Sequence, residues 1–282
     1  MEVVHKLWEQ SWDGDAVVND KQRGVYAEPS RIHPIRHEGK YFKVPGFHLC
    51  EPSPQRTPGL YQAGTSPRGT AFAARHAECT FVSGPSIKVV KKYAGELRAA
   101  VRAAGRDGDD LKIYAQALIV TAPTEAEARA KHEDYKRHID IEAALALLSG
   151  WTGVDFSRFS LDATIEYIDS DAGRSALASF SAADPHRTWT VREAAEFIGL
   201  GGRGPVLVGD PRQVADQLAQ WQDDTGIDGF NLAYALSHES MRDVVDLIVP
   251  ELQRRGRYRI DYSPGTLREK LRAAPESDII HA

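Results

Sequence analysis

The stretch EPSPQRTPGLYQAGTSPRGTAFAARHAECTFVSG, residues 51–84, places two short apolar runs on either side of a helical pattern. Residues 59–63 predict a buried strand, and residues 79–82 predict a second one. Between them, the alanine-rich residues 67–77 predict a helix. The sharp turn Gly-Thr-Ser-Pro-Arg-Gly at residues 64–69 therefore joins the end of a strand to the start of a helix.

The same alternation of strands and helices continues along the chain. Residues 112–121 predict a strong strand and residues 228–233 another, while amphipathic helices are predicted at 86–104, 211–225 and 241–255. Strands and helices that alternate through short links are typical of a parallel α/β fold. A closed barrel of this type needs eight strand–helix units. The pattern alone therefore fits either half a barrel or a small open sheet.

Two long segments interrupt the alternation. Residues 11–58 carry few helix signals, contain a predicted hairpin turn at residues 38–40, and are interpreted as an excursion from a single domain over residues 1–282. Residues 138–205 form an insertion that has its own predicted helix at 139–148. Such an insertion is either a lid or pocket wall, or a packing subdomain.

Composition and charge restrict the classes of function. The chain has 282 residues, of which 42% are hydrophobic and 27% are charged, with a formal net charge of −5. This balance favours neither nucleic acid nor an anionic membrane as a partner. The N-terminal residues show no secretory leader, so we expect a cytoplasmic protein. Cys50 and Cys79 have no metal-like spacing and are predicted to be two buried thiols.

The turn at residues 64–69 has the features of an anion site. Backbone N–H groups at a helix N-terminus lack intrahelical partners, and the aligned peptide dipoles attract negative charge there. Gly64 permits an unusual backbone angle, Thr65 and Ser66 offer hydroxyl groups, and Arg68 adds a guanidinium that suits phosphate oxygens. A plainer alternative is that Ser66 only caps the helix and Arg68 is solvated. The residues alone leave both alternatives open.

The stretch at 51–84 resembles the bacterial-luciferase-like flavin monooxygenases, in the branch that contains nitrilotriacetate monooxygenase and the enzyme that oxidises dibenzothiophene sulfone. Five further stretches resemble this branch in the same order: VVHKLWEQSWDGDAVV, HPIRHEGKYFKVPGFH, VGDPRQVADQLAQW, DGFNLAYA and VVDLIVPELQRRGRYR with the following TLREKL. The resemblance covers nearly the whole chain except residues 150–190. These motifs are specific to the branch but not to a substrate.

This resemblance implies a (β/α)8 TIM barrel of the luciferase-like type, with reduced FMN at the C-terminal mouth of the strands. EVVHKLWEQSW, residues 2–12, resembles the helix before the fifth barrel strand, so the chain corresponds to roughly the last four strand–helix units plus the insertion. No catalytic residue is assigned, because those residues would lie in the preceding half. We expect a truncated product; a split enzyme and a half-barrel that dimerises are the alternatives.

The resemblance also implies a cofactor, a partner and a set of contacts. By this resemblance, the residues expected to bind the FMN phosphate are Gly64, Thr65, Ser66, Arg68 and Gly69, with Ser66 as the leading candidate. It implies a two-component monooxygenase that uses O2 and reduced FMN from a separate flavin reductase to oxidise a small organic or xenobiotic compound. Because half a barrel exposes sheet edges, we expect a homo-oligomer. A non-catalytic half-barrel that binds a phosphate-bearing ligand, or pairs with another chain, is the alternative.

Other polar residues support weaker predictions. No metal site is expected, because the sequence contains no H-E-x-x-H motif and His33 and His37 lie in an extended region. Around the last predicted strand, Asp228 and Asn231 are expected to be mainly structural. Residues just past that strand would lie on the face where barrel sites are built, and are weaker pocket candidates: Tyr234, His238 and Glu239.

Overall fold

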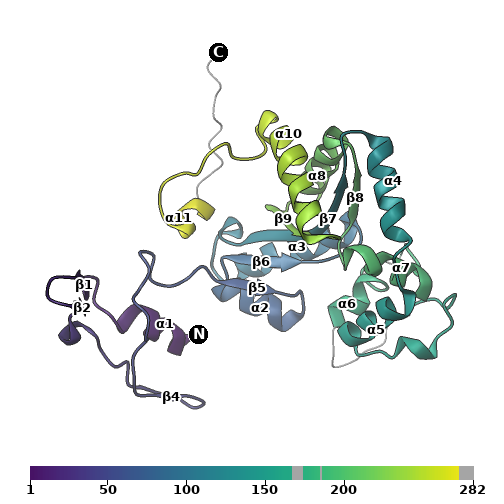
Figure 1. Ribbon diagram of the computed structural model, residues 1–282. Coiled ribbons are helices and arrows are strands. Elements are labelled where there is room, and N and C mark those ends of the chain that lie inside the picture. The colour runs from purple at the N-terminus through teal and green to yellow at the C-terminus, as the bar shows by residue number, and fades with distance from the viewer. Residues whose placement is uncertain (167–173, 185, 273–282) are drawn as a thin grey trace. The chain divides into compact units, whose positions relative to one another are not determined.

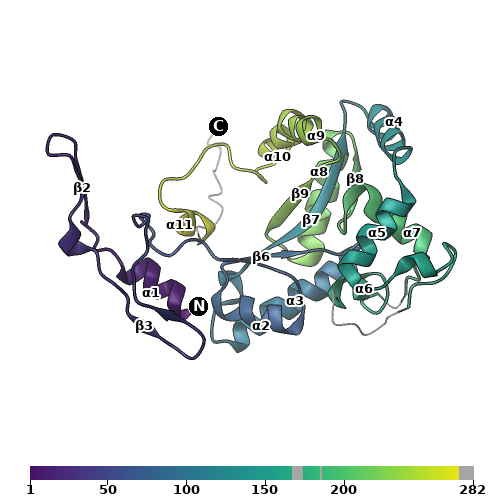
Figure 2. The same ribbon diagram turned by 60° about the horizontal axis from the view of Figure 1, so that its bottom comes forward.

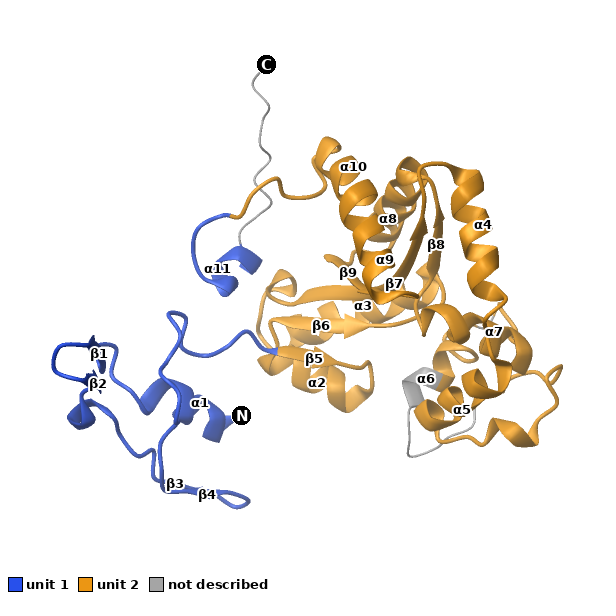
Figure 3. Ribbon diagram, in the orientation of Figure 1, with its two compact units in different colours: residues 1–60, 263–275 blue, residues 61–262, 276–282 orange. Residues whose placement is uncertain are grey.

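The structure is a computed structural model in which the chain forms two compact units (Figures 1 and 3). It describes residues 1–166, 174–184 and 186–272. The first unit comprises Met1–Leu60 and Ser263–Pro275, and the second is built on Tyr61–Tyr262. Each unit is described by itself. In the described residues, no helix is long and apolar enough to cross a membrane.

The first unit consists of short elements held together by side-chain contacts. Its elements are α1 (Glu2–Gln10), β1 (Val17–Asp20), β2 (Val25–Ala27), a 3-10 turn (Pro29–Arg31), β3 (His37–Glu38), β4 (Lys43–Val44) and α11 (Leu267–Arg272). The pairs β1–β2 and β3–β4 are antiparallel, and the second pair confirms the hairpin predicted around Gly39. The buried Trp12 donates its indole N–H to the carbonyl of His48 at 2.7 Å, which anchors the irregular segment around it.

The prediction of two buried thiols is wrong for Cys50. That residue is exposed, whereas Cys79 is fully buried. Cys50 follows β4 in a stretch without helix or strand, so no packed element covers its side chain. Cys79 begins a strand in the interior of the second unit, where burial raises the pKa of its thiol.

A parallel sheet of five strands forms the centre of the second unit. The strands are β5 (Tyr61–Ala63), β6 (Cys79–Val82), β7 (Lys112–Thr121), β8 (Val206–Gly209) and β9 (Gly229–Ala233). Residues 112–115 of β7 pair with β6, residues 118–121 pair with β8, and residues 114–118 pair with β9. All of these pairings are parallel, so the carboxyl ends of the strands point the same way. The predicted parallel α/β fold is therefore confirmed.

Strand β8 was not among the predicted strands. It is only four residues long and directly follows the insertion, which left little pattern to identify it. The helices of the second unit that pack with the sheet are α2 (Pro67–His76), α3 (Ile87–Ala103), α4 (Glu125–Lys136), α8 (Pro211–Thr225) and α9 (Ser237–Asp243), and α10 (Val249–Arg254) packs against α8. A π-helical turn at Val244–Ile248 joins the last two, where Pro250 lacks the N–H that a regular helix needs.

The two faces of the sheet differ in what covers them. Alternate residues of β7, namely Ile113, Ala115 and Ala117, are fully buried in one core with side chains of α3 and α8. The other face carries an aromatic row in which Tyr61 stacks on Phe81 at 5.6 Å between ring centroids and Phe81 meets Tyr114 at 6.2 Å. Tyr61 is 45% exposed. This face therefore presents apolar rings that the described residues cover only in part.

The insertion carries a second apolar cluster of its own. Its elements are α5 (Ile141–Thr152), a 3-10 turn (Phe156–Arg158), α6 (Arg174–Ser179) and α7 (Val191–Gly201), which lie side by side in Figure 2. Phe180 and Trp189 meet edge to face with ring centroids 5.1 Å apart, and Leu148 is fully buried beside them. A separate core fits a lid and a packing subdomain equally, so the role and limits of the insertion stay predictions.

Asp228 is a structural cross-link between the ends of two strands and a helix. Its carboxylate accepts hydrogen bonds from the backbone N–H of Ile113 at 2.7 Å and from the guanidinium of Arg98 at 2.9 Å. The Arg98 and Asp228 side chains are 17% and 24% exposed. A partly buried ion pair that also satisfies a backbone donor is costly to break from one side.

We predict that Asp228→Ala lowers the free energy of unfolding by about 1–3 kcal/mol, because it leaves the Ile113 N–H and the Arg98 guanidinium without their acceptor. Asp109→Ala is the matched control, since Asp109 also pairs with Arg98 but its side chain is 85% exposed. That change should stay within about 0.5 kcal/mol. Urea unfolding followed by circular dichroism measures the free energy of unfolding of both variants. An equal decrease in the two variants would contradict the structural role assigned to Asp228.

Candidate functional site

The turn between β5 and α2 begins with a serine cap. Ser66 has extended backbone angles and its Oγ accepts a hydrogen bond from the backbone N–H of Gly69 at 3.1 Å. The N–H of Thr70 donates to the Ser66 carbonyl at 2.8 Å, which closes the first helical turn. Pro67 takes the first helical position, where a missing N–H costs nothing. The capping role proposed for Ser66 is therefore present.

Capping does not use all the donors of this turn. Among the described residues, no hydrogen-bond acceptor meets the backbone N–H groups of Thr65, Ser66 and Arg68. The Ser66 hydroxyl accepts from Gly69 through a lone pair, so its own hydrogen is still available to an anion. The two alternatives for Ser66 are thus compatible with each other, and the turn retains the donor set that suits a phosphate.

Two glycines set the shape of the turn. Gly64 has φ +101°, a backbone conformation that side chains with a Cβ rarely adopt. A Cβ on Gly69 would lie 3.2 Å from Ser66 Oγ and 3.4 Å from the Gly64 carbonyl, inside the concave side of the turn. Ser66 and Arg68 are exposed, and Thr65 is partly buried. The absence of a side chain at both glycines therefore leaves the backbone N–H groups of the turn accessible.

The weaker pocket candidates predicted just past the last strand, β9, lie in different surroundings. Tyr234 is 55% exposed, and His238 is exposed as well. Glu239 pairs with the Lys131 ammonium at 2.6 Å, and hydrogen bonding to Lys131 is the main reason its pKa is lowered. Lys131 also pairs with Asp243. Glu239 is therefore held in a cluster that joins α4 to α9, and only Tyr234 and His238 remain open to a ligand.

Two residues near the turn were missed by the sequence-based prediction. Burial is the main cause of the raised pKa of Tyr93 on α3, while Arg203, in the loop between α7 and β8, and Thr65 act to lower it. Their sequence separation hides this proximity. The one available signal was the tripeptide Gly202-Arg203-Gly204, an arginine between two glycines directly after the insertion. Within residues 1–166, 174–184 and 186–272, no group of His, Cys, Asp or Glu side chains could hold a metal ion.

The family model described as luciferase-like monooxygenase matches residues 1–229. The chain belongs to the luciferase-like monooxygenase family. This confirms the family inferred from the turn and its flanking motifs.

Several members of this family are similar to most of the chain. It is 46% identical over 271 residues to the dimethyl-sulfide monooxygenase of Hyphomicrobium sulfonivorans, which covers 96% of the chain and 56% of that protein. The dibenzothiophene-sulfone monooxygenase of Rhodococcus erythropolis is 36% identical, covering 96% and 61%. Component A of the nitrilotriacetate monooxygenase of Aminobacter aminovorans is 33% identical, covering 95% and 60%.

Among solved structures, riboflavin lyase RcaE with modified FMN and riboflavin is 35% identical with a TM-score of 0.82, covering 96% of this chain and 59% of that chain. The chain thus spans somewhat more than half the length of these luciferase-like relatives. The matches extend over both compact units, including the turn at residues 64–69.

We predict that Ser66→Ala lowers the free energy of unfolding by about 1 kcal/mol, because the Gly69 N–H loses its acceptor at the start of α2. Ser66→Asn should retain nearly all of the stability, since asparagine caps helices as well as serine does. Denaturant titration compares the three proteins. If Ser66→Ala is as stable as the wild type, the observed cap contributes nothing and the geometry of the turn has another cause.

Proposed function

We propose that this chain is the C-terminal, half-barrel part of a two-component monooxygenase that uses reduced FMN and O2 to oxidise a small organic compound. Family membership and three relatives named as monooxygenases support the reaction class. Those relatives act, by their names, on sulfur-containing or amine-containing compounds, and a further relative, 41% identical, is named for long-chain alkanes, so the substrate of this chain is left open.

The uncovered face of the sheet supports the half-barrel part of the proposal. In a closed parallel barrel the inward residues of the strands pack against one another at the centre. Here the aromatic row Tyr61, Phe81 and Tyr114 would be such an inward layer, and it lacks its opposite wall among the described residues. The partial coverage of the relatives agrees with missing strand–helix units. A second copy or another chain would cover the same face in a homo-oligomer.

The donor set of the turn is the observation that carries the FMN proposal. Three backbone N–H groups that meet no acceptor in the described part of the chain, the Ser66 hydroxyl and the dipole of α2 belong to one turn, and this set of donors suits a phosphate monoester. A structure that contains modified FMN is similar to this chain over 96% of its length. Gly64, Thr65, Ser66, Arg68 and Gly69 would hold the FMN phosphate.

The chemistry divides between the cofactor and the protein. Reduced flavin supplies the activation of O2 and the electrons for the oxygenation. The residues of this chain would fix the nucleotide by its phosphate, which positions the ring system near the carboxyl ends of the strands. The rings of the uncovered face would exclude water from that region. A relative named as a component A supports a partner protein, which we propose to be the flavin reductase.

A non-catalytic half-barrel that binds a phosphate-bearing ligand is the second candidate. One observation favours it: the donors described at the turn are all suited to an anion, and holding an anion there requires no further chemistry. FMN binding is common to both candidates. Oxidation of a substrate in the presence of a reductase separates them.

We predict that Ser66→Asp preserves the stability of the protein and weakens its FMN binding. Aspartate caps helices well, so α2 should remain intact. Its carboxylate would repel the phosphate, and we expect FMN affinity to fall by about 10-fold or more. Ser66→Asn is the uncharged control. Quenching of flavin fluorescence measures the affinity for FMN and for riboflavin, which has no phosphate.

Ser66→Asn should bind FMN less tightly than the wild type, because it lacks the serine hydroxyl, but more tightly than Ser66→Asp, because it adds no negative charge. Riboflavin affinity should be the same in all variants. Equal FMN affinity in Ser66→Asp and Ser66→Asn would contradict phosphate binding at this turn. Failure of the wild type to bind either flavin would overturn the FMN proposal for this chain.

A further inference from the structure

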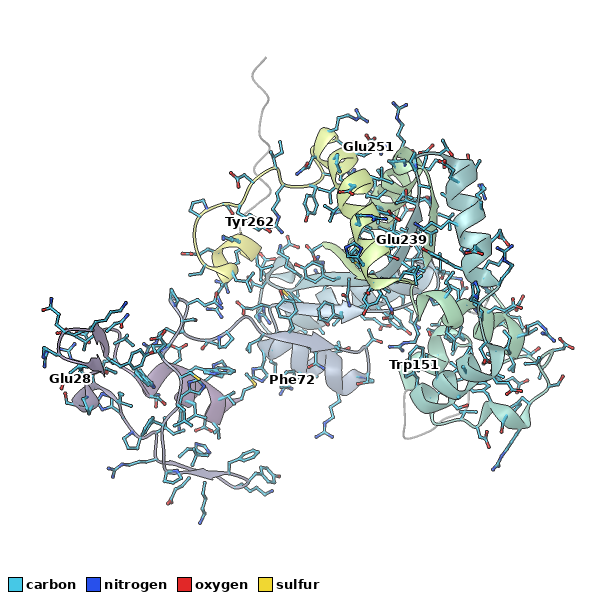
Figure 4. All side chains as sticks on the ribbon, viewed as in Figure 1. Glu28, Phe72, Trp151, Glu239, Glu251 and Tyr262 are labelled. Atoms are coloured by element: carbon cyan, nitrogen blue, oxygen red, sulfur yellow. The ribbon has the colours of Figure 1, made fainter. Side chains whose placement is uncertain are left out.

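The loop after α10 has the sequence pattern of a strand. Residues 258–262, Tyr-Arg-Ile-Asp-Tyr, alternate hydrophobic and charged side chains, which is the period of a strand with one apolar face. In the structure these residues belong to no helix or strand. All three hydrophobic side chains are exposed: Tyr258 by 46%, Ile260 by 72% and Tyr262, labelled in Figure 4, by 75%. A row of exposed hydrophobic side chains indicates a surface that another molecule covers.

Segment 258–262 is anchored at its start and keeps free backbone donors. Just before it, the Arg257 guanidinium contacts both carboxylate oxygens of Asp223 on α8, at 2.9 and 3.0 Å. The side-chain amide of Gln253 donates to the Arg259 carbonyl at 2.8 Å. Four consecutive backbone N–H groups meet no acceptor among the described residues, namely those of Tyr258, Arg259, Ile260 and Asp261. The segment therefore offers donors of the kind that an unpaired strand presents.

The two charges of this segment have no opposite charge beside them. The arginines that precede Arg259 all pair with carboxylates of α8 or α10: Arg254, Arg255 and Arg257. Arg259 makes no such pair in the described part of the chain, and its guanidinium lies 5.1 Å from the ring centroid of Tyr262 and 5.9 Å from that of Tyr258. Asp261 accepts a hydrogen bond from the backbone N–H of Tyr262 at 2.6 Å and pairs with no cation among the described residues.

The order of these charges makes the segment complementary to itself. If two copies run antiparallel about Ile260, Arg259 of each copy faces Asp261 of the other, and Tyr258 faces Tyr262. A parallel pairing in register would set like charges against each other. A shift by one residue would set each charge against an uncharged side chain. Opposite charges across a strand pair are stabilising and like charges are destabilising, so the antiparallel register about Ile260 is favoured.

We propose that segment 258–262 pairs with the same segment of a second copy of this chain, as a two-stranded antiparallel ribbon with its twofold axis at Ile260. Such a contact uses the same surface on both copies and closes on itself, so it gives a dimer. The hydrophobic side chains of both copies would lie on one face of the ribbon. On the other face, Arg259 would exchange its ring contacts for Asp261 of the second copy. The inference goes beyond the proposed function and does not depend on it.

The size of the contact sets the expected affinity. Five residues from each copy would take part, against roughly 20–30 a side in a standard specific interface. We therefore expect a weak dimer, with a Kd on the order of 100 µM. Sedimentation equilibrium of the full chain from about 10 µM to about 1 mM covers that range.

Charge reversal tests the register. Arg259→Asp and Asp261→Arg each set like charges against each other at both crossings, so either change should weaken dimerisation by about 10-fold or more. An equimolar mixture of the two variants should recover it, because the introduced aspartate of one faces the introduced arginine of the other and the native charges also pair. Arg75→Asp, at an exposed arginine in the last turn of α2, is the matched control and should dimerise as the wild type does.

A disulfide tests the twofold axis. In a Cys50→Ser background, which removes the exposed thiol, Ile260→Cys should form a covalent dimer on oxidation, because directly opposite Cα atoms lie about 4.5–5.5 Å apart. Tyr258→Cys is the matched control. Its two copies would be about 13 Å apart, beyond the reach of a disulfide, so it should not form a covalent dimer by itself.

Three results would overturn this inference. The first is a wild type that stays monomeric up to about 1 mM. The second is a dimer that both charge reversals leave unchanged, because another surface would then hold the two copies together. The third is equal cross-linking of Ile260→Cys and Tyr258→Cys, because the contact would then have no fixed register. Recovery of the dimer in the mixture, with cross-linking confined to Ile260→Cys, would support it.

Discussion

The three-way pairing of strand β7 is the constraint on which the second unit depends. Its ten residues pair in parallel with β6, β8 and β9, and its alternate side chains fill the core beneath α3 and α8. Because all the pairings are parallel, the loops after these strands gather at one edge of the sheet. The turn after β5 lies at this edge for that reason.

Stability and function make opposite demands at that edge. The cap on α2 satisfies the Gly69 N–H, while the backbone N–H groups of Thr65, Ser66 and Arg68 meet no acceptor among the described residues. At the other end of the sheet, one carboxylate oxygen of Asp228 accepts hydrogen bonds from both the Ile113 N–H and the Arg98 guanidinium. Unsatisfied polar groups are rare in proteins and concentrate where a ligand completes them. The contrast between the two ends supports a binding role for one and a structural role for the other.

The sequence predicted those elements that a short run of neighbouring residues is enough to identify. The helix at 211–225 was predicted with the residues it has, and the Ser66 cap followed from the residues around it. Strand β8 was missed because four residues carry little periodicity, and Cys50 was wrongly placed in a core because no local pattern reports packing. The interaction of Tyr93 with Arg203 could not be predicted, since it joins residues that are 110 positions apart in the sequence. The reaction class was inferred from membership of the luciferase-like monooxygenase family, because no short stretch of the sequence identifies a reaction by itself.

The central claim is that the open amides of one turn hold the phosphate of a flavin nucleotide. Backbone amide resonances report this contact directly, because a hydrogen bond to an anion shifts the resonance of its donor. Titration of isotopically labelled protein with FMN should shift the amide signals of Thr65, Ser66 and Arg68, and inorganic phosphate should shift the same three. Riboflavin should leave them in place. FMN-dependent shifts confined to other regions, with these three amides unmoved, would contradict the account.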